Sequence, residues 1–144
     1  MRIVGVELKS NEAVVSLISY AEGLVDLPPF RARRVTMSKG TDAQTLKDFQ
    51  FEFSKLMKDY QVEKVVIRER PTKGRFAGSA VGFKMEAAIQ LIEGLNVELL
   101  SANQIKTSLK HTPLPIEFAA TGLKGFQEGA FTSAFASCHL KTED

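Results

Sequence analysis

The sequence has a single cysteine, no long apolar run and almost no net charge, and each shortage excludes a class of protein. Cys138 alone cannot form an internal disulfide or supply a multi-cysteine metal site. No apolar stretch approaches the ~20 residues needed to cross a bilayer. The first residues lack the apolar core and cleavage site of a secretory signal. We therefore expect a cytoplasmic protein without a membrane partner.

The net charge of +2 does not by itself indicate a nucleic-acid partner, but the charges are unevenly distributed. The segment from residue 68 to residue 84 carries Glu69 as its only acid among five basic residues. Such segregation can create a positive face on a nearly neutral protein. An ordinary solvated surface is the competing interpretation. The basic side chains that we expect to contact phosphates are Arg68, Arg70, Lys73, Arg75 and Lys84.

The chain has 144 residues, of which 44% are apolar and 25% charged, as in an ordinary soluble domain. We expect residues 1–144 to form one domain. The apolar pattern predicts strands at residues 2–9, 13–20, 30–37, 62–70 and 96–101. It predicts helices at residues 42–59, 76–93, 102–109 and 124–140.

Two carboxylates stand at the ends of apolar strands. Glu69 follows the run at residues 65–67 and precedes a basic loop that contains Gly74, and Glu7 has the matching place in the first strand. Ligands of open α/β sheets bind beyond the carboxyl ends of the strands. We expect Glu7 and Glu69 to face the same crevice.

The order of these elements resembles the RNase H-like fold and, within it, the RuvC-type resolvases. Residues 2–7 look like the first strand of that fold, residues 64–70 like the strand that ends in its second acid, and residues 78–84 like the following helix start. The whole sequence is also similar to a small family of uncharacterised proteobacterial proteins, a domain of unknown function. The resemblance implies an α/β fold with a five-stranded mixed sheet in the order 3-2-1-4-5. The first three strands would be antiparallel, with helices on both faces.

The resemblance also implies a metal site. Glu7, Glu69 and Glu128 would be the catalytic ligands of Mg²⁺ or Mn²⁺, which activates water against a phosphodiester. Two departures from the resolvase pattern are visible. The first-strand acid is glutamate where the resolvases have aspartate, and the main acid position of the last helix falls near Gly129. In the competing interpretation, Glu7 pairs with a nearby cation and Glu128 stabilises the start of a helix.

Two functions follow, and the sequence leaves open whether the protein is an enzyme. In the first, the chain is a degenerate nuclease-like module that binds nucleic acid or a protein partner. In the alternative, it is a divalent-metal-dependent nuclease or resolvase that acts on structured nucleic acid through Glu7, Glu69 and Glu128. A homodimer is compatible with either function.

Overall fold

The first two strands form an antiparallel hairpin within the sheet. β1 (Arg2–Lys9) and β2 (Glu12–Ala21) pair along their length, with Lys9 opposite Glu12 across the turn. Ser10 in this turn has a φ of 53°, a left-handed conformation typical of tight hairpins. Successive residues of both strands enter two different hydrophobic cores. The hairpin is therefore covered on both faces.

The expectation of one continuous third strand at residues 30–37 is wrong. Two short strands pair with the outer edge of β2: β3 (Leu24–Asp26) with residues 19–21, and β4 (Arg34–Thr36) with residues 12–14. Between them stand Pro28 and Pro29. Because proline has no backbone N–H, this segment cannot continue the hydrogen-bonded ladder. The chain leaves β2 here and returns at β4.

The next elements build the parallel part of the sheet, with β5 parallel to β1 and β6 parallel to β5. The predicted first helix is confirmed: the Asp42 carboxylate accepts a hydrogen bond from the Thr45 N–H at 2.8 Å and caps its start. The second helix is shorter than predicted because Ser79 caps it; Phe76, the predicted first residue, lies outside the described residues. The elements are α1 (Ala43–Asp59), β5 (Lys64–Arg68), α2 (Ala80–Gln90) and β6 (Asn96–Leu100).

The remaining chain is helical. The prediction of one helix over residues 124–140 is replaced by a 3₁₀ turn followed by a ten-residue helix. Residues 102–111 form the short helix predicted before it, with a capping box between Ser101 and Gln104. The elements are α3 (Ala102–His111), η1 (Phe118–Thr121), η2 (Gly125–Gln127) and α4 (Glu128–Ser137).

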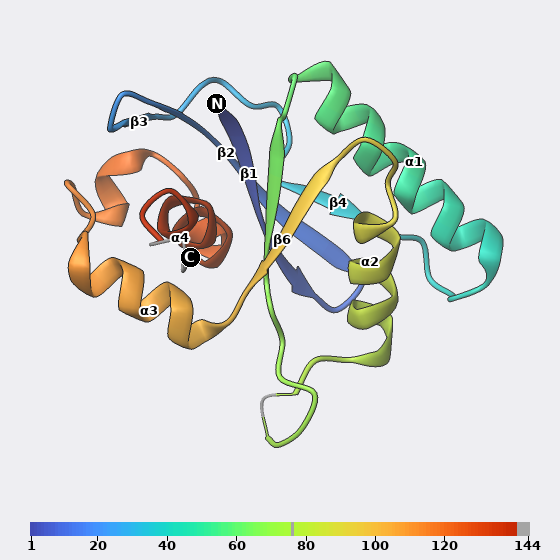
Figure 1. Ribbon diagram of the computed structural model, residues 1–144. Coiled ribbons are helices and arrows are strands. Elements are labelled where there is room, and N and C mark those ends of the chain that lie inside the picture. Colours follow the sequence, from blue (N-terminus) through green and yellow to red (C-terminus); the bar gives the residue numbers. More distant parts are fainter. Residues whose placement is uncertain (76, 141–144) are drawn as a thin grey trace.

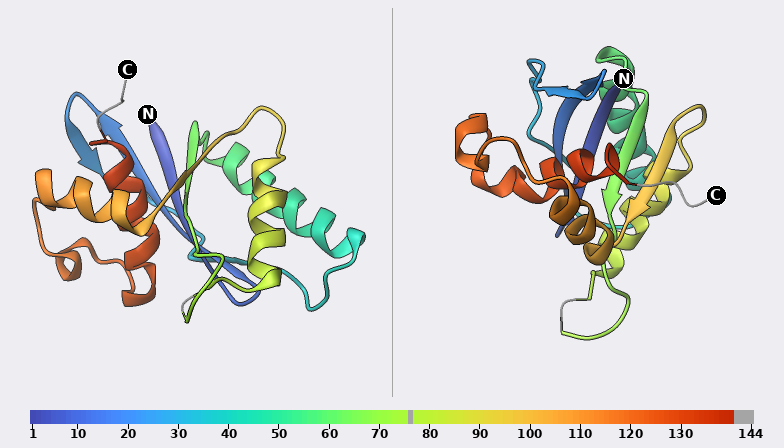
Figure 2. Two further views of the ribbon diagram at one scale, coloured as in Figure 1. Left: turned by 60° about the horizontal axis from the view of Figure 1, so that its bottom comes forward. Right: turned by 60° about the vertical axis from the view of Figure 1, so that its left-hand side comes forward.

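The sheet lies between two helical layers, with α1 and α2 on one face and α3 and α4 on the other (Figure 1). The core under α1 and α2 is built around Phe49, Phe53 and Met85. The core under α3 and α4 includes Ile3 and Phe131. Loop residues between β5 and α2 extend beyond the end of the sheet, as the turned views make clear (Figure 2).

The computed structural model describes residues 1–75 and 77–140. Within them the strand order is β3-β2-β1-β5-β6, and β4 also pairs with β2. This order confirms the predicted α/β class and mixed sheet, except that two short strands replace the third. None of the helices in the described parts is both long and apolar enough to span a membrane.

Candidate functional site

Glu7 lies on the face of the sheet that α4 covers. A Cβ atom at Gly5 would overlap the carbonyl oxygen of Ala130, and a Cβ at Gly129 would overlap the carboxylate of Glu7. Because side chains alternate along a strand, Ile3, Gly5 and Glu7 point to the same side. The Glu7 carboxylate therefore rests directly against the first turn of α4.

Glu69 lies on the opposite face. Val65 and Ile67 belong to the core under α1 and α2, whereas Val66 belongs to the core under α4. Glu69 continues the series of Val65 and Ile67, and its N–H bonds to the carbonyl of Leu100 at 2.8 Å, which keeps this residue extended beside β6. The expectation that Glu7 and Glu69 share one crevice is therefore wrong.

Arg68 takes the place beside Glu7 that was expected for Glu69. The parallel register pairs Gly5 with Val66 and the following residue with Ile67. One further step places Arg68 level with Glu7, on the same face. Where two acids were expected side by side, this face of the sheet therefore has one acid and one arginine at the same level of the two strands.

The immediate surroundings of Glu7 do not suit a magnesium ion. Its carboxylate, with 12% of the side chain exposed, forms a salt bridge of 3.3 Å with the Nζ of Lys9. Gly129 opposite it offers no ligand atom from a side chain. Mg²⁺ requires several oxygen ligands in near-octahedral geometry, but the side chain that binds the Glu7 carboxylate is the cation of Lys9. We conclude that these residues do not fit the metal that the fold family implies.

Glu128 also stands apart from a shared site. It is exposed and is the first residue of α4, the only acid in the first turn of that helix. A negative charge at this end favours the helix dipole. Among residues 1–75 and 77–140, no three His, Cys, Asp or Glu side chains are grouped so that they could hold a metal. The structure thus does not bring Glu7, Glu69 and Glu128 together.

Glu69 has an acidic neighbour on α2. Burial raises the pKa of the Glu86 carboxyl, and the negative charge of Glu69 raises it further. Both acids line a cavity of about 570 Å³ together with Arg70, Lys73 and Phe83. This hollow opens at the carboxyl end of β5, on the α2 side of the sheet. Here the charge of Glu69 contributes to the raised pKa of Glu86.

A second cavity, of about 320 Å³, lies between the β1–β2 turn and the start of α2. Of the described residues that line it, Lys9 and Arg70 are the cations and Glu86 is the one acid. Ser79, the cap of α2, lies in its wall, and the first turn of α2 carries no acid. The positive end of the helix dipole therefore adds to the two cations. Arg70, Phe83 and Glu86 line both cavities, so the two hollows adjoin.

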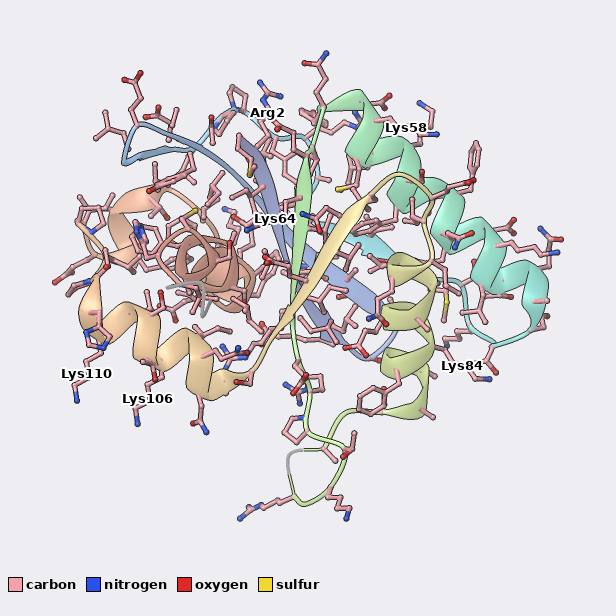
Figure 3. All side chains as sticks on the ribbon, viewed as in Figure 1. Arg2, Lys58, Lys64, Lys84, Lys106 and Lys110 are labelled. Atoms are coloured by element: carbon pink, nitrogen blue, oxygen red, sulfur yellow. The ribbon has the colours of Figure 1, made fainter. Side chains whose placement is uncertain are left out.

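The predicted basic residues divide between this region and other surfaces. Arg70 and Lys73 line the cavities, and Arg75 lies in the same loop. Arg68 is on the α4 face, and exposed Lys84 projects from the side of α2, away from the loop (Figure 3). Lys9 was not predicted. It follows Glu7 by two residues, so strand alternation could have predicted its salt bridge with Glu7 but not its place in the wall of the second cavity.

Comparison with known proteins identifies the family. A family model described as "Protein of unknown function (DUF3010)" matches residues 1–137. The chain belongs to this family. The predicted membership in a family of unknown function is confirmed, while its bacterial group stays a prediction. No curated protein matches the chain.

Two solved structures show the fold to which this DUF3010 chain is similar. The Thermus thermophilus RuvC structure has a TM-score of 0.73 at 13% identity and covers 96% of this chain and 94% of its own. T. thermophilus RuvC in complex with a Holliday junction substrate has a TM-score of 0.72, again at 13% identity, with 96% and 93% covered. The predicted RNase H-like, RuvC-like fold is confirmed. At this identity the likeness concerns the fold alone.

Proposed function

We propose that this protein is a non-catalytic RNase H-like module that binds the sugar–phosphate backbone of nucleic acid. The single observation that carries the proposal is the position of Glu7. Its carboxylate lies against Gly129, with Lys9 bonded to it. The register of β1 and β5, extended by one residue, puts Arg68 level with it. A metal-dependent nuclease needs acids there.

The binding surface that we propose is the basic region around the carboxyl end of β5. Lys9, Arg70 and Lys73 line two adjoining cavities, and the N-terminal end of α2 opens into one of them. Cations and helix N-termini are the usual partners of phosphate groups. The RuvC structure solved with a Holliday junction supports nucleic acid as the ligand of a domain with this fold.

The alternative function is a divalent-metal-dependent nuclease that uses Glu7, Glu69 and Glu128. The fold favours it, but the placement of these three acids does not. In this alternative, Mg²⁺ or Mn²⁺ would supply the nucleophilic water. Glu7 and Glu69 lie on opposite faces of the sheet. Two metal ions about 4 Å apart therefore cannot be bound by both carboxylates.

The first prediction is that the protein binds nucleic acid without a metal. Fluorescence anisotropy with a labelled four-way junction and a linear duplex should give similar affinity in Mg²⁺ and in EDTA. The affinity should fall steeply between about 50 and 200 mM salt, because phosphate contacts release counterions. Lys73→Gln should reduce the slope of log K against log salt by about one, the effect of one lost phosphate contact.

Lys106→Gln is the matched control. Lys106 is an exposed lysine that projects from α3 (Figure 3), and it lines neither cavity. Lys106→Gln removes the same charge as Lys73→Gln. Its slope of log K against log salt should therefore match the wild type, apart from the small effect of net charge. Metal-dependent cleavage of the junction that is lost in Glu69→Gln would overturn the proposal and restore the nuclease.

A further inference from the structure

A third cavity lies at the outer edge of β2, in the gap between β3 and β4. It has a volume of about 240 Å³ and shares no lining residue with the two cavities at the end of β5. One wall comes from the segment that contains Pro28, the other from residues 121–124 and Gln127. Figure 1 shows the helical turns after α3 (orange) next to the β2–β3 hairpin (blue). The cavity exists because the chain leaves β2 here.

A buried hydroxyl without a partner forms part of this cavity. Ser16 is only 1% exposed, and its Oγ makes no hydrogen bond within the described residues. Such groups are rare because burial removes their water without a replacement. Two other buried serines differ, since the Ser108 hydroxyl donates to the carbonyl of Ala136 at 2.8 Å and the Ser133 hydroxyl to that of Gly129 at 2.7 Å. The Ser16 hydroxyl is therefore a polar group beside the cavity that has no hydrogen-bond partner among the described residues.

The backbone adds a further donor. Val15 donates its N–H to the carbonyl of Arg33 at 3.0 Å, so the polar groups of Val15 point away from β1. Alternation along β2 directs the N–H of Leu17 to the same side. Leu17 lines the cavity where the β3–β4 segment has left the ladder. A ligand there meets a hydroxyl and a backbone N–H on one wall.

Among the described residues that line the cavity, Arg33 and Lys124 carry positive charge, and none is Asp or Glu. Its walls are held in place by Gln127, which is 3% exposed and bonded at both ends. The Gln127 Nε2 donates to the carbonyl of Val15 at 3.0 Å, and its Oε1 accepts from the N–H of Lys124 at 3.0 Å. This is a preorganised hollow for a small anion.

We propose that this cavity binds a phosphate group, with the Ser16 hydroxyl and the Leu17 N–H as donors and with Arg33 and Lys124 as counter-charges. The volume suits one tetrahedral oxyanion with a small substituent and is below that of cavities for drug-sized ligands. The phosphate is either free inorganic phosphate or the terminal phosphate of an oligonucleotide. This site is independent of the backbone-binding surface proposed above.

Calorimetric titration and thermal unfolding in phosphate-free buffer test this site with inorganic phosphate as the probe. The wild type should bind phosphate saturably, and its Tm should rise with phosphate concentration. Ser16→Ala and Lys124→Ala should each weaken phosphate binding about tenfold or more, as expected for a lost hydrogen bond to a charged group. A wild-type protein without a saturable response overturns the proposal.

Ser108→Ala is the matched control for the serine variant, and Lys106→Ala for the lysine variant. Ser108→Ala removes a bonded buried hydroxyl, so it should lower the Tm yet keep the full response to phosphate. Ser16→Ala should keep or raise the Tm in phosphate-free buffer. Full phosphate affinity in Ser16→Ala, or in Lys124→Ala should the serine variant not fold, contradicts the site.

A second titration distinguishes free phosphate from the terminal phosphate of an oligonucleotide. An oligonucleotide with a 5′-phosphate is compared with the same oligonucleotide ending in a hydroxyl. Tighter binding of the phosphorylated form, lost in Ser16→Ala, assigns the cavity to a nucleic-acid end. Equal binding of the two, together with saturable inorganic phosphate, assigns it to a free phosphate.

Discussion

The Glu7 side chain fills the space that a side chain at position 129 would need, so glycine at 129 and glutamate at 7 fit together. The glutamate carboxylate lies where a side chain at position 129 would begin. A longer acid on β1 therefore goes with the absence of any side chain on α4 at that point. The two departures from the resolvase pattern seen in the sequence therefore meet at one contact in the structure. The carboxylate that remains is held by Lys9.

The second prediction concerns this pair. Glycine within a helix normally costs about 0.5–1 kcal/mol relative to alanine. Gly129→Ala should gain that amount in a Glu7→Ala background, where the space is empty. In the wild-type background the new Cβ must push the carboxylate aside, so the gain should shrink or change sign. Urea unfolding of the four proteins measures the coupling, and strictly additive free energies of unfolding would contradict the shared volume.

At the scale of elements, the packing of α4 on β1 depends on Gly5. A Cβ at Gly5 would overlap the backbone carbonyl of Ala130. Backbone of a helix cannot move aside as the end of a side chain can. The buried residues Ala130, Ala134 and Ala136 keep the facing side of α4 small as well. Small residues on both partners let the helix approach the sheet closely.

The third prediction follows from this close approach. Gly5→Ala should destabilise the protein by about 1–3 kcal/mol or more, because the whole helix must shift. Gly125→Ala, just before α4, is the control. A Cβ there meets nothing within 4 Å, so its effect should stay within about 0.5 kcal/mol. Equal midpoints of chemical unfolding for the two variants would show that α4 is not in contact with β1 as described.

Most elements could be predicted from sequence because their signals are local. Asp42 before the helical run at residues 46–60 and the alternation of β1 and β2 are patterns of this kind. The side of β5 that each residue faces was not predictable. Val65, Val66 and Ile67 are all apolar because both faces of this strand are buried. The apolar pattern therefore does not show which residue faces which side of the sheet. Only packing against α4 decides that Arg68, and not Glu69, accompanies Glu7.

The split third strand was missed for a different reason. Residues 30–37 alternate bulky and basic side chains, which is typical of an outer strand. Of this segment, only residues 34–36 form a strand with β2, although the Arg33 carbonyl still accepts a hydrogen bond from the Val15 N–H. The cavity with Ser16 arises from this break and has no motif of its own. A buried serine in an apolar strand gives no sign in sequence that its hydroxyl lacks a partner.

At the scale of the whole molecule, the sheet separates the two acids that a nuclease would need together. Glu7 belongs to the side of α3 and α4, and Glu69 to the side of α1 and α2. The buried strands lie between the two carboxylates, so these groups cannot touch or share a partner. Stability effects of the two residues should therefore be independent.

The fourth prediction tests this independence. The free energies of unfolding of Glu7→Gln, Glu69→Gln and the double variant should add to within about 0.3–0.5 kcal/mol. Mg²⁺ should leave all of them unchanged, since a ligand stabilises only a folded state that binds it. The free energies of unfolding of the two variants could instead deviate from additivity by well over ~0.5 kcal/mol only when Mg²⁺ is present. That result would mean that one ion contacts both carboxylates.

The opposite border of the sheet has its own consequence. β6 is the last strand on that side, and only five residues long. Its exposed Glu98 forms a salt bridge of 2.9 Å with Lys64 of β5. Short, charged outermost strands are poor templates for the strand of another molecule. Growth of the sheet by addition of a strand at this border is therefore discouraged.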